Sequence, residues 1–186
     1  MSYTYNLNGP SVCIDTACSS SHVALHLAWH YMKETEANKC EGGLMAGVNV
    51  LLLLSTSLSL MHANMLSHES RCKTLDSLAD GYVRGEVCGT LTCFACDTKH
   101  SEGVGGIGII SSTYVNQDGR SSTLTAPSGP AQRKLLCNAL RIAKGTICCT
   151  DIRDICLHGT GTPLGDPIEM HALLQSLVCN QHMQIA

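Results

Sequence analysis

The sequence predicts an α/β fold in which short buried strands alternate with helices in layers. Three observations support this fold class. Apolar runs of strand length are bounded by Gly, Pro and Asn, and longer apolar stretches with helical spacing lie between them. The composition, 44% hydrophobic and 15% charged, is that of a chain with a packed core. Such an alternation is typical of a mostly parallel sheet, and 186 residues are enough for one domain.

The first half begins with an apolar strand pattern after the turn-forming residues Asn8, Gly9 and Pro10. In chain order we expect a strand at 11–15, a helix at 19–33, a strand at 44–53, a helix ending near Met65 and a polar loop at 67–86. The first helix has apolar residues around nearly its whole circumference, which predicts that it is buried, with Ser residues available to cap its start.

The second half continues the alternation. In chain order we expect strands at 87–96 and 103–119, a helix at 131–145 that follows Pro130 and ends at Gly145, a strand at 151–158, and a helix from Asp166 to about Val178. Gly and Asp residues mark the loops between these elements.

Charge and hydropathy exclude several classes of partner. The net charge is −3 and the Lys and Arg residues are scattered, so we expect no nucleic acid partner. The Leu-rich stretch at 48–66 is interrupted by Asn, Ser, Thr and His, which favours a strand and a helix over a membrane span. The first ten residues show no secretion signal, which predicts a cytoplasmic, reducing setting in which the twelve cysteines are mostly free thiols.

Cys18 lies where the first strand turns into the first helix. The positive end of a helix dipole and unpaired backbone N–H groups stabilise a thiolate, and the same N–H groups can stabilise an oxyanion. Cys18 is therefore a candidate nucleophile, although free cysteines are more often small buried residues.

His158 lies at the end of the last expected strand and is followed by Gly-Thr-Gly-Thr. A histidine in this position can present its imidazole to a pocket, while the glycines let a ligand approach the backbone. The alternative is an ordinary hydrogen-bonded histidine.

Two motifs together resemble a known family. DTACSSS around Cys18 and HGTGTPLGDPIE from His158 to Glu169 are similar to the signature segments of β-ketoacyl synthases, in particular the ketosynthase domains of modular polyketide synthases. The segments AGVNV, MLSHESRCKTLDSLADGYVRGE, VNQDGR and LTAPSGPAQ also resemble ketosynthase sequence, in the family's order. Residues 1–186 thus resemble part of one ketosynthase domain.

The resemblance implies a thiolase-like layered fold, αβαβα in the complete domain, and a homodimer. It implies acyl transfer from an acyl carrier protein to Cys18, followed by decarboxylative condensation with a malonyl-type extender. Substrates ride on the carrier's phosphopantetheine, so no permanently bound cofactor is expected. His158 matches a histidine that assists decarboxylation, and Thr160 and Thr162 match positions that bind the pantetheine arm. We expect Asp166 and Glu169 to support the turn and the start of the helix.

The sequence also departs from the family. It contains no match to the family's second active-site histidine segment or to its Gly-Phe-Gly-Gly segment, since no lysine follows Lys144 and His171 and His182 have other surroundings. We therefore expect this chain to be incomplete for full turnover, and we expect exposed apolar surface with aggregation or obligate association.

Two alternatives remain open at this stage. One is a non-catalytic, ketosynthase-derived interaction module, and the other is a Cys-His hydrolase built on Cys18 and His158. Cys93, Cys96 and His100 could be half of a zinc site, but the chain shows no matching second pair, so no metal is expected.

Overall fold

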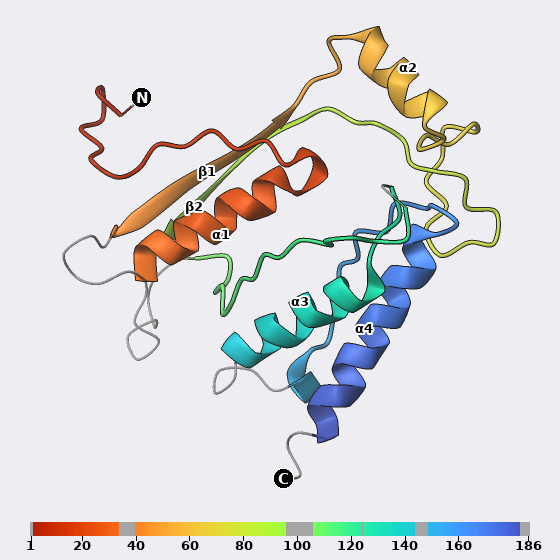
Figure 1. The fold of residues 1–186 in the computed structure, drawn as a ribbon. Coiled ribbons are helices and arrows are strands. Elements are labelled where there is room, and N and C mark those ends of the chain that lie inside the picture. Colours follow the sequence, from red (N-terminus) through yellow and green to blue (C-terminus); the bar gives the residue numbers. More distant parts are fainter. Residues whose placement is uncertain (1, 34–39, 96–105, 124, 144–148, 183–186) are drawn as a thin grey trace. The chain divides into compact units, whose positions relative to one another are not determined.

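The computed structural model describes residues 2–33, 40–95, 106–123, 125–143 and 149–182 (Figure 1). The chain forms two compact units. Unit 1 comprises Met1–Asn49 and Val87–Ile109, and unit 2 comprises Val50–Glu86 and Ile110–Ala186. Among the described helices of both units, none has the length and apolar character needed to cross a bilayer.

Unit 1 is built from a helix and a two-stranded sheet. In chain order it contains the short 3-10 helix η1 (Ala17–Ser19), the helix α1 (Ser20–Lys33) and the strands β1 (Gly42–Asn49) and β2 (Val87–Phe94). β1 and β2 pair antiparallel along their whole lengths, from Gly42 opposite Phe94 to Asn49 opposite Val87.

The helix α1 lies closely against β1 because small residues meet at the contact. A Cβ atom added to Gly43 would lie 3.1 Å from the Cβ of Ala28, and one added to Gly47 would lie 2.5 Å from Oγ of Ser21. Gly43 and Gly47 are four residues apart, so they share one face of the strand. This close approach fixes the helix that follows Cys18.

Unit 2 is built mainly from helices. It contains α2 (Leu54–His62), α3 (Gly129–Ile142), the short 3-10 helix η2 (Cys149–Asp151) and α4 (Gly165–His182). The helices α3 and α4 pack against each other (Figure 1). Among the described residues, Ala172 and Ser176 of α4 have the most buried side chains, at 2% and 0% exposure. Ser128 caps α3 by accepting a hydrogen bond from the Ala131 N–H at 3.3 Å.

The expected mostly parallel sheet is not observed. The sheet in the described residues has two strands, and they are antiparallel. The expected strands at 11–15, 103–119 and 151–158 have no ladder partner over their described residues. A strand exists only where a second segment completes its hydrogen bonds, and the sequence pattern of one segment does not report its partner. The helices and the two paired strands lie where the sequence predicts them, with shifts at their ends.

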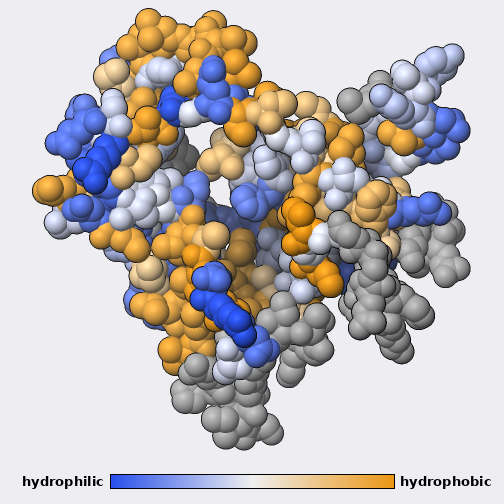
Figure 2. Space-filling model, turned by 180° about the vertical axis from the view of Figure 1, so that it is seen from behind, coloured by the Kyte–Doolittle hydropathy of each residue, from blue (hydrophilic) through white to orange (hydrophobic). Residues whose placement is uncertain are grey.

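Apolar side chains are exposed in both units, as expected from the sequence. In unit 2 the residues leading into α2 are the clearest case, since Leu52 is 81% and Leu54 is 74% exposed. Figure 2 shows apolar side chains gathered over this part of the molecule, at the upper left of the view. The expected association of the chain remains a prediction.

Candidate active site

Cys18 lies in η1, directly before α1, and its side chain is exposed. The expected turn between an extended segment and a helix is therefore observed, although residues 11–15 form no ladder. The Cys18 N–H has no hydrogen-bond acceptor among the described residues. It is therefore available to donate to an oxyanion that forms next to the thiol.

The turn around Cys18 holds its neighbour Ala17 in the left-handed region, with φ +57°. A non-glycine residue pays of order 1 kcal/mol or more for this conformation. Two local hydrogen bonds offset the cost: the Ala17 N–H donates to Oδ1 of Asp15 at 3.1 Å, and Ser20 Oγ donates to the Ala17 carbonyl at 2.7 Å. The sequence pattern does not reveal this strained residue.

Hydroxyl groups complete the turn. Ser19 Oγ donates to the Thr16 carbonyl at 2.9 Å and lies 2.8 Å from Thr16 Oγ1, and the Thr16 N–H donates to Ser20 Oγ at 2.9 Å. We expected Ser residues to cap the helix. Instead, the hydroxyls of Ser19 and Ser20 form hydrogen bonds with Thr16 and Ala17 in the preceding turn. Thr16 at the N-cap of η1 makes no side-chain cap bond. The hydroxyls are thus engaged in the turn, and the Cys18 thiol is its exposed candidate nucleophile.

The turn that carries His158 is in unit 2 and is held by the carboxylate of Glu169. Oε1 of Glu169 accepts from the His158 N–H at 2.7 Å, and Oε2 accepts from the Gly159 N–H at 3.0 Å. A carboxylate that accepts two backbone N–H groups fixes both in position. The expected turn-supporting role of Glu169 is thus observed, and the His158 side chain is exposed.

Asp166 joins the same turn to a distant loop. Its side chain is 3% exposed, and its two oxygens accept from the Gly161 N–H at 3.0 Å and from the Leu75 N–H at 2.8 Å. The sequence suggests the first of these roles. The second, across 91 positions, could not be found from the motif.

Thr160 and Thr162 lie side by side after His158. Their Oγ1 atoms are 3.1 Å apart, and Thr162 Oγ1 also accepts from the Gly165 N–H at 3.1 Å, at the start of α4. Thr162 therefore holds the helix start, which leaves Thr160 as the freer hydroxyl of the pair. Binding of a pantetheine arm by either residue remains a prediction.

Residues 66–83, called here the clamp loop, pack against the histidine turn. Thr74 Oγ1 donates to the Gly159 carbonyl at 2.6 Å, and the Gly81 N–H donates to the Gly161 carbonyl at 2.8 Å. Gly81 has φ +131°, and a Cβ there would lie 2.5 Å from the Met65 carbonyl oxygen, so only glycine fits this approach. The turn is thus held from both sides.

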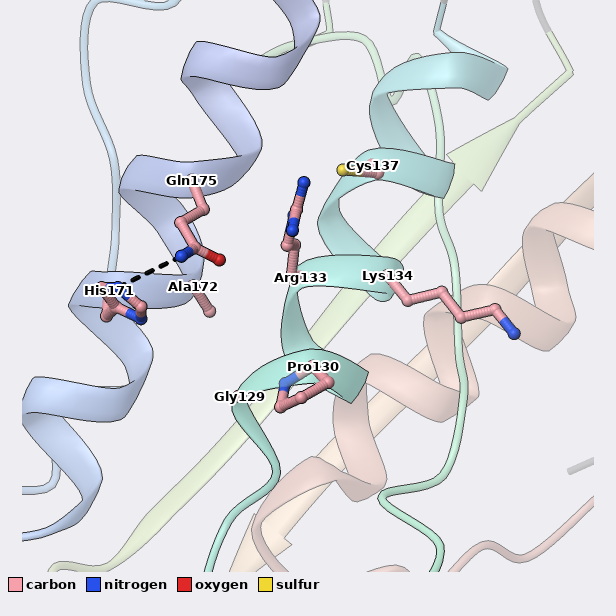
Figure 3. Close-up of a pocket in the computed structure, with 8 residues that line it drawn as sticks. All are labelled: Gly129, Pro130, Arg133, Lys134, Cys137, His171, Ala172 and Gln175. Carbon is pink, nitrogen blue, oxygen red and sulfur yellow. Dashed lines mark hydrogen bonds between the residues drawn. The ribbon is translucent and has the colours of Figure 1, made fainter.

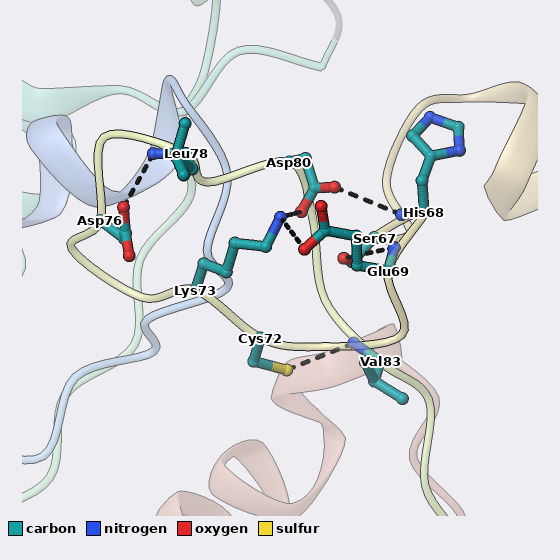
Figure 4. Close-up of polar contacts among 9 residues, drawn as sticks. All are labelled: Ser67, His68, Glu69, Cys72, Lys73, Asp76, Leu78, Asp80 and Val83. Carbon is teal, nitrogen blue, oxygen red and sulfur yellow. Dashed lines mark hydrogen bonds and ion pairs between the residues drawn. The ribbon is translucent and has the colours of Figure 1, made fainter.

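Lys73 organises the clamp loop itself (Figure 4). Its Nζ lies 3.1 Å from Glu69 Oε2 and 3.2 Å from Asp80 Oδ1. The hydrogen bond to Glu69 is the main cause that raises the pKa of Lys73, and a hydrogen bond from Ser67, followed by Lys73, lowers the pKa of Asp80. Both residues are therefore charged over a wide range around neutral pH.

The structure brings together His158, Thr160 and Thr162 in one turn of unit 2, whereas Cys18 belongs to unit 1. No group of three or more His, Cys, Asp or Glu residues in the described ranges is arranged to hold a metal ion. Of the three residues considered for zinc, Cys93 is a free, half-buried thiol, and Cys96 and His100 lie outside the described residues.

Family models match nearly the whole chain. The N-terminal domain of β-ketoacyl synthases matches residues 1–92, and the C-terminal domain matches residues 107–186. The two matches together include both candidate turns, since Cys18 falls in the first and His158 in the second.

Curated relatives and solved structures agree with these models. The chain is 44% identical over 173 residues to a phenolphthiocerol/phthiocerol polyketide synthase of Mycobacterium tuberculosis, covering 93% of this chain and 8% of that protein. It is 40% identical over 174 residues to the spectinabilin polyketide synthase system protein NorA' of Streptomyces orinoci, covering 94% of this chain and 5% of that protein.

A ketosynthase from module 6 of the bacillaene synthase of Bacillus subtilis matches with a TM-score of 0.86 and 36% identity, covering 96% of this chain and 32% of that one. The chain thus spans about a third of a solved ketosynthase chain and a small part of the multidomain relatives. It belongs to the β-ketoacyl synthase family and corresponds to part of a ketosynthase domain of the modular polyketide synthase type.

Proposed function

We propose that Cys18 accepts an acyl group from the phosphopantetheine thioester of an acyl carrier protein. The thiolate attacks the thioester carbonyl, the carbonyl oxygen becomes an oxyanion, and the carrier thiol leaves and takes up a proton. The exposed position of Cys18 and its unengaged N–H support this step. Family membership supports the same assignment.

In the second half-reaction, a malonyl-type thioester loses CO2 and its enolate carbon attacks the acyl group on Cys18. The new carbon–carbon bond forms as the bond between the acyl carbonyl carbon and Sγ of Cys18 breaks, and the Cys18 thiolate is released. We assign His158 to the enolate oxygen, as a hydrogen-bond donor held by Glu169 and the clamp loop. Thr160 and Thr162 are assigned to the pantetheine arm. A homodimer and a cytoplasmic setting belong to the same proposal.

One observation carries this proposal: Cys18 lies at the start of a helix, in a turn that has a strained residue and is held by hydrogen bonds among its own residues. Incubation with an acyl thioester, followed by intact-mass measurement, tests it. The wild type should gain one acyl mass and Cys18→Ala should gain none. Cys13→Ala is the control and should match the wild type, because Cys13 is also an exposed thiol of unit 1 but lies outside this turn. A folded wild type that gains no acyl mass would refute the assignment.

A second assay separates loading from condensation. With a malonyl thioester, the chain should release little CO2. The family uses two active-site histidines, and this sequence matches only the segment of the first, at His158. Steady, Cys18-dependent release of free acid from an acyl thioester would instead indicate a hydrolase. Binding of a carrier protein without acylation would indicate an interaction module.

A further inference from the structure

Unit 2 contains a groove between α3 and α4, and none of its lining residues belongs to the turn of Cys18 or the turn of His158. Its volume is about 470 Å3, within the range of small-molecule sites. The residues used below are those of its walls and its end at the start of α3: Pro130, Arg133, Cys137, His171 and Gln175. Figure 3 shows these side chains from the two facing helices.

The groove is cationic, and none of the described residues that line it is acidic. Arg133 is exposed and makes no ion pair with any described residue. α3 carries no acidic residue, and the carboxylates of Asp166 and Glu169 on α4 are bonded to backbone N–H groups of the histidine turn. In Figure 3 the Arg133 guanidinium lies between the helices, whereas the Lys134 side chain extends away from α4.

His171 and Gln175 form the opposite wall. The side-chain amide nitrogen of Gln175 lies 3.2 Å from His171 Nε2 (Figure 3). The amide of Gln175 and the imidazole of His171 thus contact each other on this wall. The groove then offers the guanidinium of Arg133 from α3 opposite two polar side chains of α4, and a guanidinium is donor chemistry suited to an anion.

Apolar surface adjoins these donors. Pro130 and Cys137 line the same groove, and their side chains are exposed and half-buried, respectively. A guanidinium pairs in two-pronged fashion with a carboxylate or a phosphate. We propose that this groove binds a small organic oxyanion, whose carboxylate or phosphate group contacts Arg133 and whose apolar part lies along Pro130 and Cys137. This site is independent of acyl transfer at Cys18.

Isothermal titration calorimetry at low salt and neutral pH tests the proposal on the whole chain with three probes: phenyl phosphate, benzoate and uncharged benzyl alcohol. One or both anions should bind saturably and more weakly at high salt, and the stronger one identifies the oxyanion class. Arg133→Gln should weaken binding about tenfold, because a charge-assisted hydrogen bond is lost. Arg133→Lys should give an intermediate loss, because it keeps the charge and loses the fork.

The control belongs to the same helix. Arg141→Gln removes an exposed positive charge in the last turn of α3, outside the groove. This variant should bind as the wild type does. Since the Arg133 and Arg141 side chains are exposed, unchanged circular dichroism should accompany each substitution.

Several results would overturn the proposal. These are binding of neither anion, equal binding of benzyl alcohol, or an equal loss in Arg141→Gln and Arg133→Gln. Binding of a poly-glutamate peptide in the absence of small-anion binding would replace the small-molecule site with a surface for an acidic protein.

Discussion

The turn of Cys18 and the turn of His158 are stabilised in opposite ways. Around Cys18, the hydrogen bonds join residues at most four positions apart, and they hold Ala17 in a strained conformation. Around His158, decisive hydrogen bonds arrive from Thr74 and Leu75, which are 85 and 91 positions from their partners. The turn of Cys18 is therefore encoded locally, whereas the turn of His158 depends on the fold of unit 2.

The largest expected loss of stability is at the turn of His158, which is held by long-range hydrogen bonds. Asp166→Asn places an amide N–H opposite one of two backbone donors in a buried site, so we expect unit 2 to lose about 3 kcal/mol of stability. Hydrogen exchange should show loss of protection at the Gly161 and Leu75 amides. Asp154→Asn, at an exposed position, is the matched control and should change neither quantity.

The next effect concerns how α1 is held against β1. Gly43→Val adds side-chain volume where a Cβ alone already lies 3.1 Å from Ala28, so we expect a loss of about 1–3 kcal/mol in unit 1 and faster hydrogen exchange in α1. Gly89→Val on β2 meets no atom within 4 Å and serves as the control. An equal effect of both substitutions would mean that strand glycine as such, not the close contact, determines stability.

A smaller, stabilising effect is expected at the local turn. Ala17→Gly relieves the left-handed strain but makes the unfolded chain more flexible, so we expect a net gain of at most about 1 kcal/mol in chemical denaturation. Acylation of Cys18 should persist, because the hydrogen bonds around residue 17 involve its backbone. Destabilisation by this substitution would contradict the strained geometry.

The smallest effect is a pH dependence in α1. Burial, and then the neighbouring His30 ring at 4.4 Å, lower the pKa of His26 below its ordinary 6.5. The folded state thus takes up the proton less readily than the unfolded state. The contribution of neutral His26 to stability is present above about pH 6.5. It is lost as the pH falls through 6.5 towards the lower pKa that His26 has in the folded state. Hydrogen exchange of α1 should be faster at pH 5 than at pH 7.5, once the intrinsic pH dependence of exchange is corrected for, and His26→Gln should reduce the difference.

The sequence predicts the parts of the fold and site that depend on short segments. Helical spacing located α1, α3 and α4 to within a few residues, and the motif around Cys18 indicated a turn before a helix. The pairing of the strands could not be predicted from the sequence. Residues 44–49 pair with residues 87–92, and a long stretch of chain separates the two segments. For the same reason the clamp by Thr74 and Gly81 was missed: nothing in a polar loop reports which distant carbonyl it will contact.

We propose that the turn of Cys18, and not thiol exposure alone, makes this cysteine the nucleophile. The most direct measurement is peptide mapping of the thiol-modified sites after a brief, substoichiometric treatment with an acyl thioester. Cys13, Cys72, Cys88 and Cys156 are also exposed and serve as internal controls. We predict that acylation concentrates on Cys18. An even distribution of acyl groups over the exposed cysteines would contradict the claim.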